Sequence, residues 1–239
     1  FRVAREMQLT ADEMVMIEPA LDQYAVALDA ALVARNARLE TMRGEMLASM
    51  MERDVEKAKT LANEEVALRT AVRSVNEQFA QQVAQALGEP RGVQFSAAFV
   101  RQSFPRIERA TFAQRSFDEA LTIDGLTPET ITAIQSIQEQ YQASVKTKNA
   151  ELRSAVRENE PKEVEMRVEF WAARMNDQEP PQRQSDLRAQ FEDRFKLDQD
   201  YRKQLESLLT VEQIAQLPPV PVPGEGGRRG PMRGFSGGG

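Results

Sequence analysis

The chain has 239 residues, 31 Lys and Arg against 37 Asp and Glu, a net charge of −6, and neither histidine nor cysteine. Disulfide scaffolds, thiol nucleophiles, zinc fingers, iron–sulfur clusters, Ser-His-Asp triads and histidine-based metal sites are therefore excluded. The mild acidity argues against a dedicated nucleic-acid-binding protein, which needs a basic surface. No apolar run approaches the roughly 18–20 residues of a membrane-spanning helix.

Long helices are predicted in the first part of the chain. Apolar residues from Met14 to Met50 recur at intervals of three, four or seven, which places them on one face of a single long helix. Pro19 lies near the start of this helix and is expected at most to kink it. Asp54 is a plausible N-cap for a second helix, whose apolar stripe runs from Leu61 to Leu87.

The remaining elements are also predicted to be helical. Between residues 91 and 123 the pattern gives a helix from about Ala97 to Phe104 and another from Ile107 to Leu121. A long stripe then runs from Ile131 to Val156, and Asn159-Glu160-Pro161 is expected to break it. Helices over about 164–175 and 187–208 follow. No segment alternates with a period of two, so the chain is predicted to be all-α.

The last residues differ in composition from everything before them. Pro218 to Pro223 is polyproline-like and stiff, and the stretch after it is rich in Gly and Arg with nothing to pack a core, so we expect a disordered tail. Such a tail resembles Arg/Gly-rich segments that bind RNA or acidic surfaces. A flexible tail without a partner is the alternative. Its candidate contact residues are Arg228, Arg229, Arg233 and Phe235.

The two halves of the chain resemble each other. A Leu-Thr pair opens each half, and a tyrosine follows it, Tyr24 in the first half and Tyr141 in the second. Corresponding residues of the two halves are 117 positions apart in both cases. Further on, Asn76 and Phe79 correspond to Asp198 and Tyr201. We therefore predict an internal duplication, with related helical units of long antiparallel helices at residues 1–122 and 123–217 and the tail at 218–239.

One short motif occurs three times and has a clear structural meaning. Each copy is a leucine followed by a threonine, which is the pattern of a helix start with the threonine as N-cap. In two copies a Glu or Gln three residues later can close a capping box, and in all three the leucine can form a hydrophobic staple with an apolar residue inside the helix. The residues are Leu9, Thr10, Glu13, Leu126, Thr127, Leu209, Thr210 and Gln213.

This motif in an all-helical, cysteine-free chain resembles the LTxxQ family of bacterial envelope proteins, the Spy/CpxP-like periplasmic group. Leu209–Gln213 matches the motif fully, whereas the copy at Leu9 has Glu in place of Gln and the copy at Leu126 has Thr. The resemblance implies a thin, curved cradle of two units and ATP-independent chaperone or stress-sensing work in the periplasm. Some relatives bind zinc or copper, but without His or Cys that role is not carried over.

A chaperone of this kind needs an adaptable apolar surface, for which methionine is well suited. Two candidate surfaces for unfolded or partner polypeptides stand out, one near the end of the first long helix and one around the single tryptophan. The alternative in both cases is ordinary core packing. The candidate residues are Leu39, Met42, Arg43, Met46, Leu47, Met50 and Met51, and Phe170 with Trp171.

The sequence favours binding over catalysis. Its carboxylates lie among Arg and Lys at helical spacing, as in Glu56 and Lys59, and read as solvated helix faces. We therefore expect no enzyme, no cofactor and no metal, and nucleic acid only through the tail. The chain begins at Phe1, so we expect a removed signal peptide and a periplasmic location. The alternative function is a non-catalytic accessory subunit of a larger assembly, or a self-associating one, tethered by the Pro/Gly/Arg tail.

Overall fold

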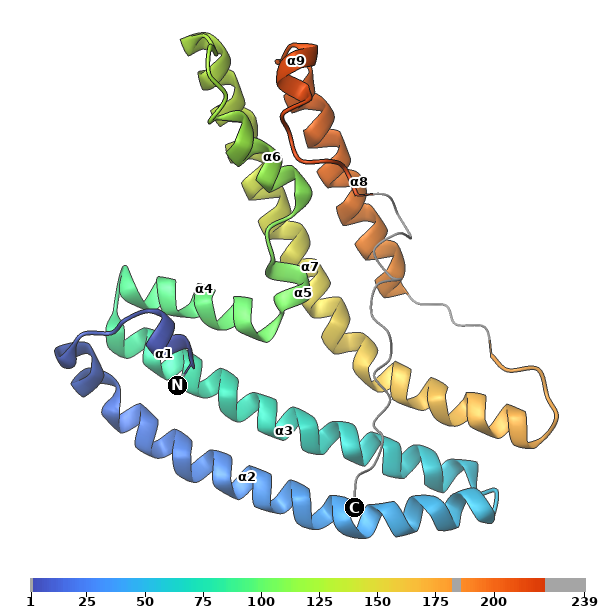
Figure 1. Ribbon diagram of the computed structural model, residues 1–239. Helices are drawn as coiled ribbons and strands as arrows, with labels where there is room; N and C mark the ends of the chain where they lie inside the picture. Colours follow the sequence, from blue (N-terminus) through green and yellow to red (C-terminus); the bar gives the residue numbers. More distant parts are fainter. Residues whose placement is uncertain (1, 182–185, 222–239) are drawn as a thin grey trace, which may run out of the picture. The chain divides into compact units, whose positions relative to one another are not determined.

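The computed structural model describes residues 2–181 and 186–221, and within these ranges the protein is all-α, as predicted (Figure 1). The candidate tail contacts Arg228, Arg229, Arg233 and Phe235 lie outside the described residues. The helices are α1 (Arg2–Glu6), α2 (Ala11–Met51), α3 (Val55–Leu87), α4 (Arg91–Ser103), α5 (Pro105–Glu108), α6 (Phe112–Ala120), α7 (Pro128–Met175), α8 (Asp186–Glu206) and α9 (Val211–Ile214).

Two compact units make up the structure, and each contains segments that are far apart in the sequence. Unit 1 consists of Phe1–Arg109 and Asn149–Ala189, and unit 2 of Ala110–Lys148 and the chain from Gln190 onward. The predicted repeats 1–122 and 123–217 follow the order of the sequence. The compact units divide the chain differently, because α7 contributes its first part to unit 2 and its second part to unit 1.

The long hairpin of α2 and α3 forms the frame of unit 1, where the two helices lie side by side and antiparallel (Figure 1). Local signals set both starts. Thr10 caps α2 and forms a capping box with Glu13, and the Asp54 carboxylate accepts a hydrogen bond from the Lys57 backbone N–H at the start of α3. Arg53 adopts a φ of 57° in the turn between the helices.

The core of unit 1 has two parts. At one end, Ile17, Val83 and Phe95 are buried together where α2, α3 and α4 meet. At the other end, small side chains of α3 pack against Val164 and Val168 of α7. Between α3 and α4 the backbones approach so closely that a Cβ on Gly92 would lie 2.0 Å from the Ala84 carbonyl oxygen. Glycine is therefore required at this contact.

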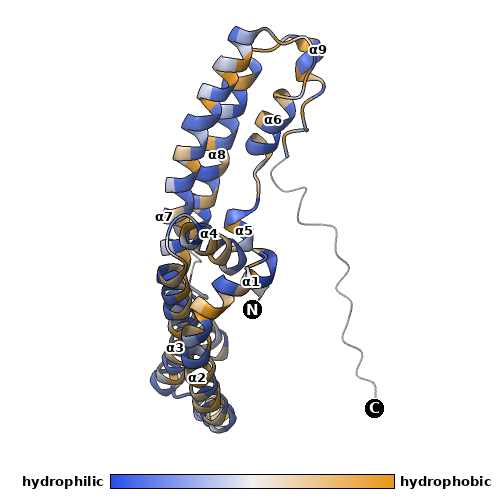
Figure 2. Ribbon diagram, turned by 90° about the vertical axis from the view of Figure 1, so that its left-hand side faces the viewer, coloured by the Kyte–Doolittle hydropathy of each residue, from blue (hydrophilic) through white to orange (hydrophobic). Residues whose placement is uncertain are grey.

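Unit 2 has its own core, made by α6, the first part of α7 and α8. Tyr141, Phe117, Ile134 and Leu205 are fully buried in it. The buried Arg202 side chain of α8 donates to the Ser116 hydroxyl of α6 and, at 3.0 Å, to the Pro218 carbonyl. Figure 2 shows how hydrophobic and hydrophilic residues alternate in patches along α8, as expected of a helix that is buried on one side.

Three predicted boundaries are wrong. The helix predicted from Ile107 to Leu121 is divided into α5 and α6, because Thr111 caps a new helix start and accepts a hydrogen bond from the Gln114 backbone N–H. The helix predicted to break at Asn159-Glu160-Pro161 continues through Pro161 as α7, because residues on both sides of the proline are held by α3: Arg73 of α3 binds Glu160 at 2.6 Å, and Val164 is buried. The helix predicted to begin near Ala97 begins at Arg91, and its first turn contains Gly92, which packs closely against α3. The short helix α1 was not predicted.

Candidate functional site

The outer face of α2 carries a row of exposed apolar side chains, which we call the outer stripe: Val15, Val26, Val33, Leu47 and Met51. Successive members are 11, 7, 14 and 4 residues apart, and each interval is close to a whole number of turns at 3.6 residues per turn. They therefore share one side of the helix. Each of these side chains is 59–78% exposed. Single exposed apolar residues are ordinary, but several of them on one face of a helix mark a candidate interaction surface.

The opposite face of α2 is also apolar and is covered by α3. Ile17 and Met42 are buried there. The Tyr24 ring stacks on Phe79 with ring centroids 4.2 Å apart, and its hydroxyl donates to the Asn76 Oδ1 at 2.7 Å. Because this inner face already packs unit 1 together, the outer stripe is not needed for the core. The inner apolar face of α2 is used within unit 1, so the outer apolar face is available to bind another molecule.

Acidic side chains border the outer stripe. Arg38 of α2 is engaged by two glutamates: it donates to Glu64 at 2.6 Å and to Glu45 at 2.7 Å. These hydrogen bonds lower the pKa of both glutamates and keep all three groups charged. Only Arg43 is an exposed base on this helix. The exposed acidic residues of α2 are Asp12, Glu18, Asp22, Asp29 and Glu40.

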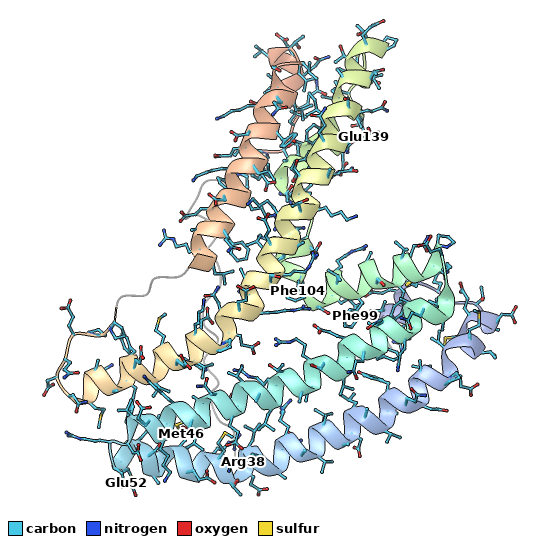
Figure 3. The ribbon with its side chains drawn as sticks, turned by 180° about the vertical axis from the view of Figure 1, so that it is seen from behind. Arg38, Met46, Glu52, Phe99, Phe104 and Glu139 are labelled. Carbon is cyan, nitrogen blue, oxygen red and sulfur yellow. The ribbon has the colours of Figure 1, made fainter. Side chains whose placement is uncertain are left out.

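The methionine-rich surface predicted from the sequence is divided by the structure between core and surface. Met42 is buried, and Met46 packs against the cluster that contains Val164 and Val168. Figure 3 shows Met46 near the end of the α2–α3 hairpin. Leu39 and Met50 are half-buried, whereas Arg43, Leu47 and Met51 are exposed. The two exposed apolar members belong to the outer stripe.

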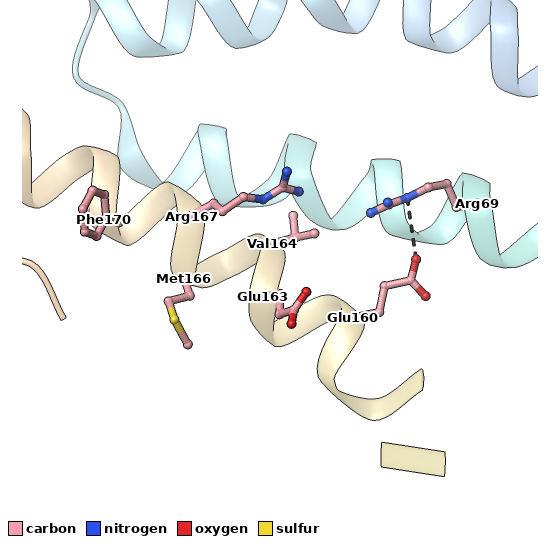
Figure 4. Close-up of a pocket in the computed structure, with 7 residues that line it drawn as sticks. All are labelled: Arg69, Glu160, Glu163, Val164, Met166, Arg167 and Phe170. Atoms are coloured by element: carbon pink, nitrogen blue, oxygen red, sulfur yellow. Dashed lines mark ion pairs between the residues drawn. The ribbon is translucent and has the colours of Figure 1, made fainter. Parts of the chain in front are cut away.

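The second predicted surface lies on α7 in unit 1. Phe170 is exposed, and Trp171 beside it is half-buried. Phe170, Met166 and Val164 line a cavity of about 470 Å³, together with Arg69 of α3 (Figure 4). Since Val164 shares a core cluster with Met46, the structure brings both predicted surfaces to the same end of unit 1.

The repeated Leu-Thr motif has the structural role that its chemistry predicts. Thr10 and Thr210 each form a capping box, with Glu13 and Gln213, and Thr127 accepts a hydrogen bond from the Thr130 backbone N–H. The preceding leucines Leu9, Leu126 and Leu209 pack against the cores of their units.

Glu13 also joins α2 to α4. Its carboxylate accepts from Arg91 Nε at 2.6 Å and Nη2 at 3.0 Å, while also accepting from the Thr10 backbone N–H. These hydrogen bonds lower the pKa of Glu13 to about 2. The motif at this position therefore stabilises the fold.

Within the described ranges, no helix is both long enough and apolar enough to cross a membrane, and no cluster of three or more acidic side chains is placed to hold a metal ion. No protein-family model matches the chain, and searches of curated proteins and of solved structures also found no match.

Proposed function

We propose that this protein is an ATP-independent, chaperone-like protein of the bacterial periplasm, similar to the Spy/CpxP group, which binds unfolded or partner polypeptides along the outer stripe of α2. The observation that carries the proposal is the exposed apolar row from Val15 to Met51. An extended apolar surface suits a polypeptide that has not yet buried its own apolar side chains, because contact removes both surfaces from water.

The charges beside the stripe define the preferred polypeptide. Asp22, Asp29 and Glu40 lie in or beside the row of apolar side chains, and their carboxylates are exposed. Segments that combine apolar residues with Lys or Arg match this surface in both hydropathy and charge. Electrostatic attraction of this kind speeds association and weakens as salt is raised. Basic unfolded clients are therefore preferred over acidic ones.

Equivalent contacts in the two halves support the tandem arrangement in this proposal. Tyr24 of the first half donates its hydroxyl to Asn76 at 2.7 Å, and Tyr141 of the second half donates to Asp198 at 2.7 Å. The same tyrosines also contact Phe79 and Tyr201, with ring centroids 4.2 and 5.3 Å apart. Each contact in the first half therefore has a counterpart in the second half, between residues that correspond in the sequence duplication.

The test is aggregation suppression without ATP. A chemically unfolded basic client is diluted into buffer, and its light scattering is followed with increasing amounts of the full chain. The wild-type protein should suppress scattering near equal molar amounts. The double variant Val26→Ser and Val33→Ser should require several times more protein, because it removes the centre of the stripe.

The matched control is Val211→Ser, which changes an equally exposed valine on α9. It should suppress aggregation as well as the wild type does. If the wild-type protein leaves scattering unchanged, or if the double variant and the control behave alike, the outer stripe is not a client-binding surface. An acidic client of similar size tests the charge preference separately.

A further inference from the structure

A second cavity lies in unit 1, away from the outer stripe. Its volume is about 580 Å³, and its walls come from α1, α2, α3, α4 and the second part of α7. Phenylalanine side chains dominate these walls, and Figure 3 labels two of them at the α4 end. Cavities of about 300–1,000 Å³ with apolar walls and a few polar groups are typical of small-molecule sites. The rings belong to Phe79, Phe95, Phe99 and Phe104.

Positive charge is concentrated at this cavity. Arg69, Arg73 and Arg157 all line it, whereas Glu77 is the acidic residue in its wall. Two of the three guanidinium groups already have close partners. Arg157 binds Glu77 at 2.5 Å and lies 5.4 Å from the centroid of the Phe104 ring, and Arg73 binds Glu160 at 2.6 Å.

Arg69 has only longer ion pairs and no hydrogen bond at two of its nitrogen atoms. Its Nε lies 3.7 Å from Glu160 and 4.0 Å from Glu65, and both distances are too long for a hydrogen bond (Figure 4). Its Nε and Nη2 atoms are buried and have no hydrogen-bond acceptor among the described residues. Buried donors without acceptors are uncommon and costly, and each one calls for an explanation. Arg69 lines this cavity as well as the one beside Phe170. A ligand in the phenylalanine-lined cavity that carries a hydrogen-bond acceptor would therefore satisfy the free Arg69 donors.

We infer that this cavity binds a single-chain carboxylate, with its head on Arg69 and its aliphatic chain among the phenylalanine rings. Charge supports an anion, because three arginines and one glutamate line the cavity. A planar guanidinium binds a carboxylate through two parallel N–H donors. The rings and the nearby Leu21 and Val72 provide the apolar surface for the chain. This inference stands independently of the proposed chaperone function.

Isothermal titration calorimetry of the full chain with decanoate tests this site, with decanol as the uncharged ligand of equal chain length. Decanoate should bind with one molecule per chain, and decanol at least tenfold more weakly. Arg69→Gln should weaken decanoate binding tenfold or more and leave decanol binding unchanged. Arg69→Lys, which keeps the charge but loses the planar fork, should give an intermediate affinity.

The matched control is Arg101→Gln, because Arg101 is an exposed arginine of α4 that does not line the cavity. It should bind decanoate as the wild type does, and circular dichroism should give equal helix content for all variants. Equal affinity for decanoate and decanol, an unchanged affinity in both Arg69 variants, or no heat of binding would overturn the inference. If Arg69→Gln fails to fold, Arg69→Lys and the comparison of the two ligands decide it. Binding of decanoate to the outer stripe instead would be lost in Val26→Ser/Val33→Ser and kept in the Arg69 variants.

Discussion

Two tyrosines in equivalent positions have different burial, and this difference determines their importance for stability. Tyr141 is fully buried, and its hydroxyl contacts Asp198 and Thr111, whereas Tyr24 is only half-buried against Asn76. Burial raises the pKa of Asp198. The native state therefore holds a proton at Asp198 more tightly than the unfolded chain does. As pH rises above the ordinary value of 3.8, ionising this buried carboxyl lowers the stability of the fold. The Tyr141 hydroxyl limits that loss by donating to the carboxylate.

Removing the two hydroxyl groups should have unequal effects. Tyr141→Phe leaves a buried carboxylate with one donor fewer, and we expect it to lower the free energy of unfolding by about 2 kcal/mol. Tyr24→Phe leaves a half-buried amide that water can reach, and we expect a loss of about 1 kcal/mol or less. Urea unfolding followed by circular dichroism at pH 7 compares the two. A larger loss for Tyr24→Phe would contradict the burial argument.

Glu13 makes a pH-dependent contribution of the opposite sign. Its folded pKa of about 2 lies below the ordinary value of 4.5, so its stabilising effect is complete above pH 4.5 and is lost as pH falls toward 2. Glu13→Gln keeps the capping box, as Gln213 does at α9, but loses the ion pair with Arg91. Thermal unfolding of both proteins between pH 7 and pH 2 should show a higher midpoint for the wild type at pH 7 and a difference that disappears by pH 2. A constant difference across this range would exclude the ion pair as its cause.

At the scale of single elements, α2 is unusual because it is apolar on two opposite faces. Its inner face is buried against α3, and its outer stripe is exposed. The two faces should therefore respond differently to truncation.

Ile17→Ala on the inner face should lower the free energy of unfolding by about 2–5 kcal/mol, because Ile17 is fully buried and the change leaves a cavity. Val26→Ser and Val33→Ser on the outer face should each change it by about 0.5 kcal/mol or less. Denaturant unfolding measures all three variants. A large loss from either serine variant would mean that the stripe is covered by the protein itself.

Most helices were predictable because their signals are local. Thr10 and Asp54 cap their helices through side chains only three residues from the backbone groups they satisfy. The error at Pro161 arose because a distant segment overrides a local signal: Arg73 and the core around Val164 hold both sides of the proline within α7. The division between α5 and α6 has a local cause, the Thr111 cap, which an apolar stripe does not show.

The candidate site was only partly predictable, for a related reason. Met42 and Leu47 both follow helical spacing, but one is buried and the other exposed, and periodicity alone does not say which apolar face meets α3. Val15, Val26 and Val33 lie outside the richest apolar face of α2, so that pattern does not single them out. Their intervals of 11 and 7 residues were the available signal.

At the scale of the whole molecule, the chain builds two compact units from interleaved segments, and each has its own core. Unit 1 holds the outer stripe, both predicted polypeptide-binding surfaces and the arginine-lined cavity, whereas unit 2 is organised around Tyr141, Asp198 and Arg202. The proposed binding functions therefore belong to unit 1, and substitutions in the core of unit 2 should affect stability before they affect binding.

The most direct test of the central claim is site-specific photo-crosslinking of an unfolded basic client. A photoreactive amino acid is placed at Val33 in the outer stripe and, as the matched position, at Val211 on α9, both of which are exposed. The client should crosslink from residue 33 and only at background level from residue 211, and the yield from residue 33 should fall as salt is raised. Equal yields from the two positions, or none from residue 33 while the protein suppresses aggregation, would contradict the claim that α2 binds the client.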